Sequence, residues 1–152
     1  MNEAEEPAPR PQLPAARVVV GVDGSPGSLS ALEWATHEAA VRATLLDVVH
    51  VRMFRSVLYE SVPGSEHWEE DVLEDALARV RTWEPEVAVE GRVVDPPAAK
   101  ALIDASEGAD MLVVGSRGLG GFQELELGSV SHQVTAHARC PVVVVRPTRR
   151  AV

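Results

Sequence analysis

The chain has 152 residues, a length that corresponds to one domain with a single hydrophobic core. Hydrophobic residues make up 45% and charged residues 24%, a composition that excludes a disordered or fibrous protein. Fourteen basic and 23 acidic residues leave a net charge of −9, so we expect neither nucleic acid nor an anionic membrane as a partner.

The single cysteine, Cys140, excludes an intrachain disulfide and a multi-cysteine metal site, and it favours a reducing, cytoplasmic location. No apolar stretch approaches the roughly 20 residues that span a bilayer. Residues 1–16 are acidic and rich in proline, unlike the basic start and apolar centre of a secretory signal. We expect residues 1–16 to form a flexible N-terminal tail, residues 17–147 one domain, and residues 148–152 a short C-terminal tail.

The first half of the chain alternates short β-branched runs with helical periodicity. Residues 17–22 predict a strand that is buried on both faces. Asp23-Gly24-Ser25-Pro26 follows as a turn and a helix start, with Ser25 placed to cap the helix and Pro26 at its first position. The helix then carries apolar residues at helical spacing: Leu32, Ala35, Ala39 and Ala43. Residues 45–51 predict a second strand, and residues 52–65 a loop.

The second half continues the same alternation. A helix is expected over residues 66–82, with an inward stripe of Val72, Leu73, Ala76, Leu77 and Val80. Residues 87–94 predict a strand near the edge of the sheet, and Asp95-Pro96 is expected to cap the next helix. The remaining predicted elements are a strand at 111–114, a glycine-rich loop at 115–128, a helix at about 129–138 and a strand at 141–146.

Acidic residues are concentrated between positions 60 and 90. This segment is interpreted either as the solvated face of a helix or as an acidic docking surface.

Strands that alternate with amphipathic helices predict right-handed crossovers and a parallel sheet that helices cover on both faces. The fold class is therefore a single doubly wound α/β domain of the Rossmann type. In such a sheet a ligand binds beyond the carboxyl ends of the strands, where the winding direction reverses. The first and fourth predicted strands end in suitable residues.

The loop after the fourth strand is the most informative segment. Its glycines allow backbone N–H groups to approach a ligand closely: Gly115, Gly118, Gly120, Gly121 and Gly128. Gly128-Ser129 then opens a helix whose N-terminal dipole favours an anion by roughly 0.3–1 kcal/mol. Ser129 and Ser131 offer hydroxyl groups to phosphate oxygens, and Arg117 either reaches a phosphate or is simply exposed. Glycine content by itself is equally compatible with a plain strand–helix connection.

Several common site types lack support. Neither GxxxxGK[ST] nor GxGxxG after the first strand occurs, and no GxSxG elbow is present. The chain has five histidines: His37, His50, His67, His132 and His137. The last two lie five residues apart on one predicted helix, which does not match the spacing of helical zinc sites, and we expect no metal site formed by side chains alone. Cys140 is expected to be a buried, inert thiol.

Four segments together resemble the universal stress protein family: VVVGVDGS, VVGSRGLGGF, LGSVS and HARCPVVVVR. The resemblance covers residues 17–147. Nucleotide-binding members of the family share the pattern G-x2-G-x9-G-[ST], which Gly115, Gly118, Gly128 and Ser129 match in every spacing.

The resemblance implies an adenine nucleotide, ATP above all, bound together with Mg²⁺. Ribose and phosphates would lie beside Gly115, Ser116, Arg117 and Gly118, and the phosphates at Gly128, Ser129, Val130 and Ser131. Gly21 and Asp23 would lie beside the adenosine, where Asp23 accepts from a ribose hydroxyl or approaches the bound Mg²⁺. The backbone around Val49 and Val51 would face the edge of the adenine.

The resemblance also implies the strand order 3-2-1-4-5 and a homodimer through the last strand, Val142–Val145, whose apolar edge seeks a partner. The chain departs from the family pattern at Glu124 and Glu126, which would repel a polyphosphate if they point inward. The leading hypothesis is a non-enzymatic, ATP-dependent stress-response regulator that acts on a protein partner. The alternatives are a slow ATP hydrolase and a dimeric interaction module without nucleotide binding.

Overall fold

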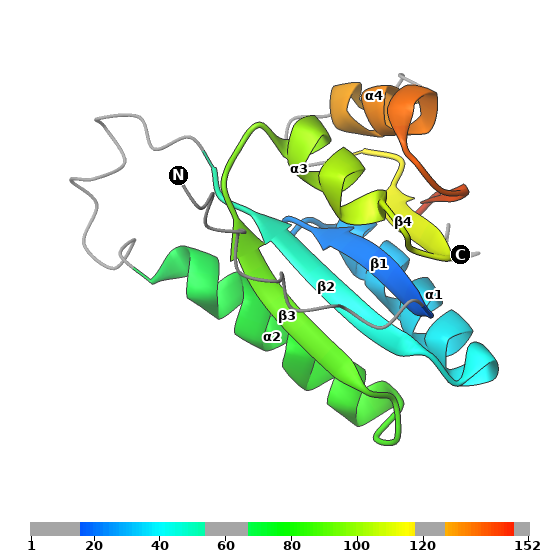
Figure 1. The fold of residues 1–152 in the computed structure, drawn as a ribbon. Helices are drawn as coiled ribbons and strands as arrows, with labels where there is room; N and C mark the ends of the chain where they lie inside the picture. The colour runs from blue at the N-terminus through cyan, green and yellow to red at the C-terminus, as the bar shows by residue number, and fades with distance from the viewer. Residues whose placement is uncertain (1–15, 54–66, 118–126, 148–152) are drawn as a thin grey trace, which may run out of the picture.

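The computed structural model describes residues 16–53, 67–117 and 127–147, and within them strands and helices alternate along the chain (Figure 1). The elements are β1 (Arg17–Val22), α1 (Pro26–Arg42), β2 (Leu45–Val51), α2 (Trp68–Trp83), β3 (Val89–Val94), α3 (Ala98–Ser106), β4 (Met111–Gly115), α4 (Ser129–His137) and β5 (Val142–Val145). The five strands form one parallel sheet in the order β3-β2-β1-β4-β5. This confirms the predicted fold class and strand order. The predicted tails lie outside the described residues, apart from Ala16.

Two hydrophobic cores lie on opposite faces of the sheet because alternate strand residues point to opposite sides. Val18 and Val20 of β1 pack with Leu32 of α1 and Val80 of α2. Val19 of β1 packs instead with a second cluster, which contains residues of α3 and α4. Helices α1 and α2 therefore cover one face, and α3 and α4 cover the other (Figure 1). Within the described residues, no helix has both the length and the apolarity needed to cross a membrane.

The start of α1 follows the predicted capping pattern. Ser25 Oγ accepts a hydrogen bond from the backbone N–H of Ser28 at 3.2 Å, and Pro26 is the first helical residue. The helix ends at Arg42, and the C-cap residue Ala43 adopts a left-handed conformation with φ = 51°. Because α1 begins at Pro26, only the turn of residues 23–25 separates it from β1, and this turn lies at the edge of the sheet.

Two predicted boundaries are wrong. Strand β3 begins at Val89 because the N–H of Val87 donates to the carbonyl of Glu84 at 3.1 Å, and this turn keeps Val87 out of the strand. The expected cap at Asp95-Pro96 is not formed. The N-cap of α3 is Pro97, which provides no side-chain hydrogen bond, and the exposed Asp95 pairs with Arg52 at 3.6 Å.

Candidate functional site

The carboxyl ends of β1 and β4 lie side by side, because β1 pairs with β2 on one side and with β4 on the other. The winding direction reverses between these two strands: the chain passes through α1 on one face and through α3 and α4 on the other. This is the position at which doubly wound sheets bind ligands. The structure thus brings the β1 turn together with the first residues of the glycine-rich segment.

The turn after β1 is held by its own polar groups. Asp23 Oδ1 accepts from the N–H of Ser25 at 2.8 Å, and the N–H of Asp23 donates to Ser28 Oγ at 3.2 Å. Asp23 directly follows β1 and is half-buried, so its carboxylate lies at the edge of the sheet. The two hydrogen bonds fix the turn that carries it. Sequence reasoning identified Asp23 but not Ser28, whose hydroxyl fixes the peptide group before Asp23.

Gly21 and Val49 lie deeper than Asp23. They are register partners on β1 and β2, and Val49 is fully buried. A Cβ atom added to Gly21 would lie 3.1 Å from Leu102 Cδ2 of α3, so the absence of a side chain here allows α3 to pack on the sheet. Val51, the half-buried last residue of β2, lies nearer the edge than Val49.

Ser116 joins β4, β5 and α4 through its backbone. Its N–H donates to the carbonyl of Val145 at 3.0 Å, and its carbonyl accepts from the N–H of Gly128 at 2.7 Å. Ser131 Oγ donates to the carbonyl of Gly115 at 2.6 Å, which ties the first turn of α4 to the end of β4. The start of α4 is therefore held against the end of β4 by backbone and side-chain bonds together.

The two helices that begin at this edge differ in the state of their N-termini. In α1, Ser25 caps the first turn. The N-cap of α4 is Gly128, which makes no side-chain capping bond within the described residues, and its first turn contains no acidic residue. Both Ser129 and Val130 are exposed. Helix α4 therefore presents its N-terminal N–H groups and dipole toward the edge of the sheet.

The two serines of α4 have different hydrogen-bonding states. Ser131 is buried, and its hydroxyl hydrogen is used in the bond to Gly115. Ser129 Oγ instead accepts from Gln133 Nε2 at 3.3 Å, which leaves its own hydroxyl hydrogen for another acceptor. Ser129 is thus the better placed of the two hydroxyl donors.

Gly27 and Gly115 allow α1 to approach β4 backbone to backbone. A Cβ atom on Gly27 would lie 2.7 Å from the carbonyl oxygen of Arg117, and one on Gly115 would lie 2.9 Å from the backbone of Gly27. Gly115, predicted as a ligand-contacting glycine, therefore has a packing reason to be glycine. Sequence reasoning missed Gly27, although its place directly after Ser25-Pro26 was a visible signal.

Part of the predicted site lies outside the described residues: Gly118, Gly120, Gly121, Glu124 and Glu126. Arg117 is half-buried and takes part in an interaction of its own. Among the described residues, no group of three histidine, cysteine, aspartate or glutamate side chains is placed to hold a metal ion.

Cys140 is half-buried rather than buried. Burial raises the pKa of its thiol, and the Asp110 carboxylate acts in the same direction, while a hydrogen bond from Ser106 and the charge of Arg17 oppose the rise. The raised pKa disfavours the thiolate, so Cys140 is not an activated nucleophile.

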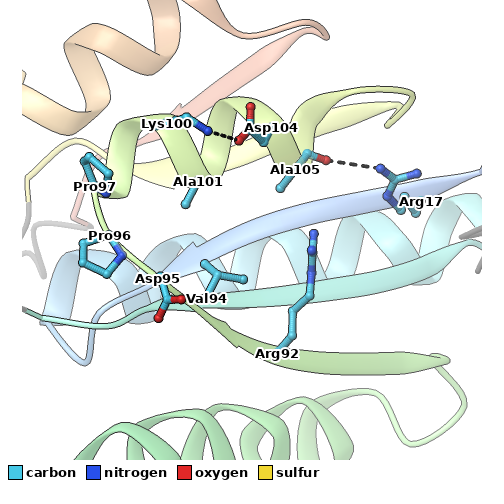
Figure 2. A pocket seen from close by; sticks show the side chains of 10 residues that line it. All are labelled: Arg17, Arg92, Val94, Asp95, Pro96, Pro97, Lys100, Ala101, Asp104 and Ala105. Carbon is cyan, nitrogen blue, oxygen red and sulfur yellow. Dashed lines mark hydrogen bonds and ion pairs between the residues drawn. The ribbon is translucent and has the colours of Figure 1, made fainter. Parts of the chain in front are cut away.

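A concavity away from this edge lies between α3 and β3, with a volume of about 490 Å³ (Figure 2). Arg92 extends across it and donates twice to the buried Asp47, at 3.3 and 3.1 Å. Arg17 donates to the carbonyls of Ala105 and Glu107 at the end of α3, at 3.2 and 2.8 Å. The groove contains none of the predicted site residues, and its two arginines hold neighbouring elements together. We therefore place the candidate site at the β1–β4 edge.

The fold and this edge define a doubly wound parallel α/β domain with its candidate site at the switch point of the sheet. The family model described as "Universal stress protein family" matches residues 15–146. The chain belongs to the universal stress protein family.

Curated relatives carry the same family name. The chain is 36% identical over 140 residues to Universal stress protein Rv2623 of Mycobacterium tuberculosis, a match that covers 84% of this chain and 46% of the relative. It is 40% identical over 151 residues to Universal stress protein Rv1996 of the same organism, covering 93% and 47%. The chain thus spans about half the length of these relatives.

Solved structures show the same fold. A universal stress protein in complex with cAMP superposes with a TM-score of 0.68 at 28% identity, covering 88% of this chain and 98% of that one. An Arabidopsis thaliana protein of the family, solved with AMP bound, gives a TM-score of 0.65 at 23% identity over 88% and 93% of the two chains. The second likeness concerns the fold alone.

The close approach of α1 to β4 makes a prediction about stability. Intrinsic helix propensity favours alanine over glycine by roughly 1 kcal/mol, so Gly27→Ala would stabilise an unobstructed helix. Because the added methyl group meets the carbonyl of Arg117, we expect Gly27→Ala to destabilise the protein by about 1–3 kcal/mol in urea unfolding. Ser30→Ala, three residues further on in α1, is the control and should change stability by less than about 0.5 kcal/mol. A stabilised Gly27→Ala protein would contradict the close approach.

Proposed function

We propose that this protein binds an adenine nucleotide at the β1–β4 edge and acts as a nucleotide-dependent regulator in the stress response. The observation that carries the proposal is the start of α4 at the switch point of the sheet, where Gly128 and Ser129 form a helix N-terminus that no side chain of the described residues caps. Helix N-termini of this kind bind phosphate through backbone N–H groups and the helix dipole. The cAMP bound by a relative of the same fold supports the same class of ligand.

The phosphates would bind the first turn of α4. Gly128 brings no side chain to the approach, Ser129 adds a hydroxyl donor, and the backbone of Val130 and Ser131 continues the row of N–H groups. Ser131 would contribute its N–H rather than its hydroxyl, because the hydroxyl holds the carbonyl of Gly115. Ser116, Arg117 and Gly118 would pass beside the ribose and phosphates, and Gly120 and Gly121 would complete the loop.

The adenosine would lie over the ends of β1 and β2. Asp23 would accept from a ribose hydroxyl or approach a nucleotide-bound Mg²⁺ with the carboxylate that the β1 turn holds at the edge. Gly21 and the backbone near Val49 would form the deeper wall of this part of the site. ATP with Mg²⁺ is the ligand that we propose among the adenine nucleotides.

A regulatory role fits the side chains of the site better than catalysis. Asp23 is the acidic residue in the β1 turn, and its Oδ1 accepts from Ser25, which gives the carboxylate a structural task. In a regulator, ligand binding must also change a surface that a partner contacts, which requires contacts between the ligand site and that surface. Ser116 provides one, since its backbone bonds join the start of α4 to Val145 at the end of β5.

Replacing Ser129 with aspartate separates the phosphate site from simple helix stability. An acidic residue in the first turn of α4 should raise the stability of the nucleotide-free protein by about 0.3–1 kcal/mol through the helix dipole. The same carboxylate should weaken Mg·ATP binding about tenfold or more, because each pair of like charges at 4 Å costs about 1 kcal/mol even in water-like dielectric. Urea unfolding and calorimetric titration measure the two effects.

Thr135→Asp is the matched control, since it adds the same charge to an exposed position near the other end of α4. It should leave ATP affinity within about twofold of the parent, because a charge beyond one Debye length, about 8–10 Å, is largely screened. Equal affinity in the Ser129→Asp protein and the parent would rule out phosphate binding at α4.

We also propose that two copies of the chain pair along β5. The carbonyls of Pro141 and Val145 accept from Leu112 and Ser116, so by the alternation of a parallel ladder Val142 and Val144 direct their backbone groups away from β4, toward the open edge. Val144→Pro removes one outward N–H and should convert a dimer into a folded monomer in sedimentation equilibrium, with the native circular dichroism retained. Val130→Ala, on the exposed first turn of α4, is the control and should stay dimeric. A Val144→Pro protein that remains dimeric would exclude pairing through β5.

A further inference from the structure

His50 lies at the centre of a buried polar cluster that the proposed nucleotide contacts do not include. It is fully buried on β2, and its Nδ1 lies 2.8 Å from the carbonyl oxygen of Val22, the last residue of β1. Its Nε2 is hydrogen-bonded to Oε2 of Glu69, which is itself buried at the start of α2. One side chain therefore joins β1, β2 and α2.

The surroundings of His50 keep its ring in one orientation. The ring of Trp68 packs against it edge to face, with centroids 5.7 Å apart and an interplanar angle of 71°. Glu69 is fixed in turn, because its Oε1 accepts from the N–H of Met53 at 3.1 Å. A rotation of the imidazole would break the bonds to Val22 and Glu69 together, in a place that water does not reach.

The acceptor at Val22 also fixes where a hydrogen must lie. A carbonyl oxygen can only accept, so Nδ1 of His50 carries a hydrogen and donates it. The other ring nitrogen, Nε2, is hydrogen-bonded to the Glu69 carboxylate. The imidazole thus donates to β1 through one nitrogen while Glu69 holds the other.

The bond to Val22 fixes the peptide group that leads into Asp23. That peptide unit consists of the carbonyl of Val22 and the N–H of Asp23. His50 holds the carbonyl, and Ser28 Oγ accepts from the N–H at 3.2 Å. Both polar atoms of one peptide group are therefore held from opposite ends, by β2 and by α1.

We infer that His50, oriented by Glu69, is a positioning residue for the candidate site. It holds the Val22–Asp23 peptide so that the Asp23 carboxylate is positioned to contact the nucleotide. The inference rests on the proposed function, since it assigns a role within that site. A buried polar pair adds little net stability by itself. A positioning role therefore accounts for the buried His50–Glu69 pair better than a contribution to stability does.

Two amide substitutions separate the two bonds of His50. In His50→Asn, the amide nitrogen can occupy the place of Nδ1 and keep the bond to Val22, while the contact with Glu69 is lost. In His50→Gln, the longer side chain can reach Glu69 but no longer donates to Val22. Both variants leave a buried position underfilled and should unfold at lower urea concentration than the parent.

Mg·ATP affinity should distinguish the two variants. Because a net hydrogen bond corresponds to a factor of about 2–10 in an equilibrium, His50→Gln should weaken binding about 3- to 10-fold, while His50→Asn stays within about twofold. Asp47→Asn is the control: on the same strand, it removes the buried negative charge that pairs with Arg92 and leaves the Val22–Asp23 peptide alone. It should lower stability without weakening binding.

A nucleotide-free measurement accompanies the titration. Hydrogen exchange of the Asp23 amide, followed by NMR, should be faster in His50→Gln than in His50→Asn, since only the former releases the peptide carbonyl. Affinities that fall in both His50 variants and in Asp47→Asn in proportion to their loss of stability would overturn the inference. So would equal exchange of the Asp23 amide in the two His50 variants.

Failure of the proposed function gives a different result. A folded parent protein that binds no adenine nucleotide would overturn the nucleotide proposal and, with it, the role of His50 in binding. The exchange of the Asp23 amide would still decide whether His50 holds the Val22–Asp23 peptide.

Discussion

The backbone contact between the start of α1 and the end of β4 is the constraint on which the rest of the site depends. Gly27 and Gly115 bring the two segments so close that a single methyl group on either would meet backbone atoms. Because α1 is capped by Ser25 and closed by this contact, its N-terminus is occupied by the protein itself. The N-terminus of α4 lies at the same edge, and within the described part of the chain no side chain caps it. Under the proposed function, α4 rather than α1 is therefore the helix that receives the phosphates.

Two polar junctions complete the edge from opposite sides. On one side, Ser116 links the start of α4 to Val145 of β5 through backbone bonds. On the other, His50 and Ser28 hold the peptide group before Asp23. Ligand groups at α4 and at Asp23 would thus contact two separately fixed structures, with β1 and β4 as the rigid connection between them. Under the proposed function, occupancy at α4 can reach the β5 edge through Ser116.

Predictions of strands and caps that rest on local patterns were confirmed, and the cap prediction that depends on contacts distant in sequence was wrong. The strands were predictable because β-branched runs such as residues 17–22 are buried on both faces, a pattern that other elements rarely show. The cap at Ser25 was predictable because its bond to Ser28 is local. The cap at Asp95 was wrong because the sequence does not reveal that α3 begins only after Pro97, or that Asp95 pairs with Arg52 of a neighbouring strand end.

The roles of single residues within the site were less predictable, since they depend on contacts that are distant in sequence. Gly115 was interpreted through its loop, yet its absent side chain accommodates Gly27 from α1. The backbone around Val49 was expected to face the adenine edge, which stays a prediction, while the side chain of Val49 lies in the core. His50 was considered only as a metal ligand, because nothing in the spacing connects it with Glu69 or with the carbonyl of Val22.

The most direct measurement of the central claim is the change in backbone amide chemical shifts during titration of the nitrogen-15-labelled protein with Mg·ATP. The account predicts that the largest shifts among the described residues fall on Ser129, Val130 and Ser131, with Asp23 next. Saturation with shifts confined to the groove around Arg92 and Lys100, or no shifts at millimolar nucleotide, would contradict a phosphate site at the start of α4.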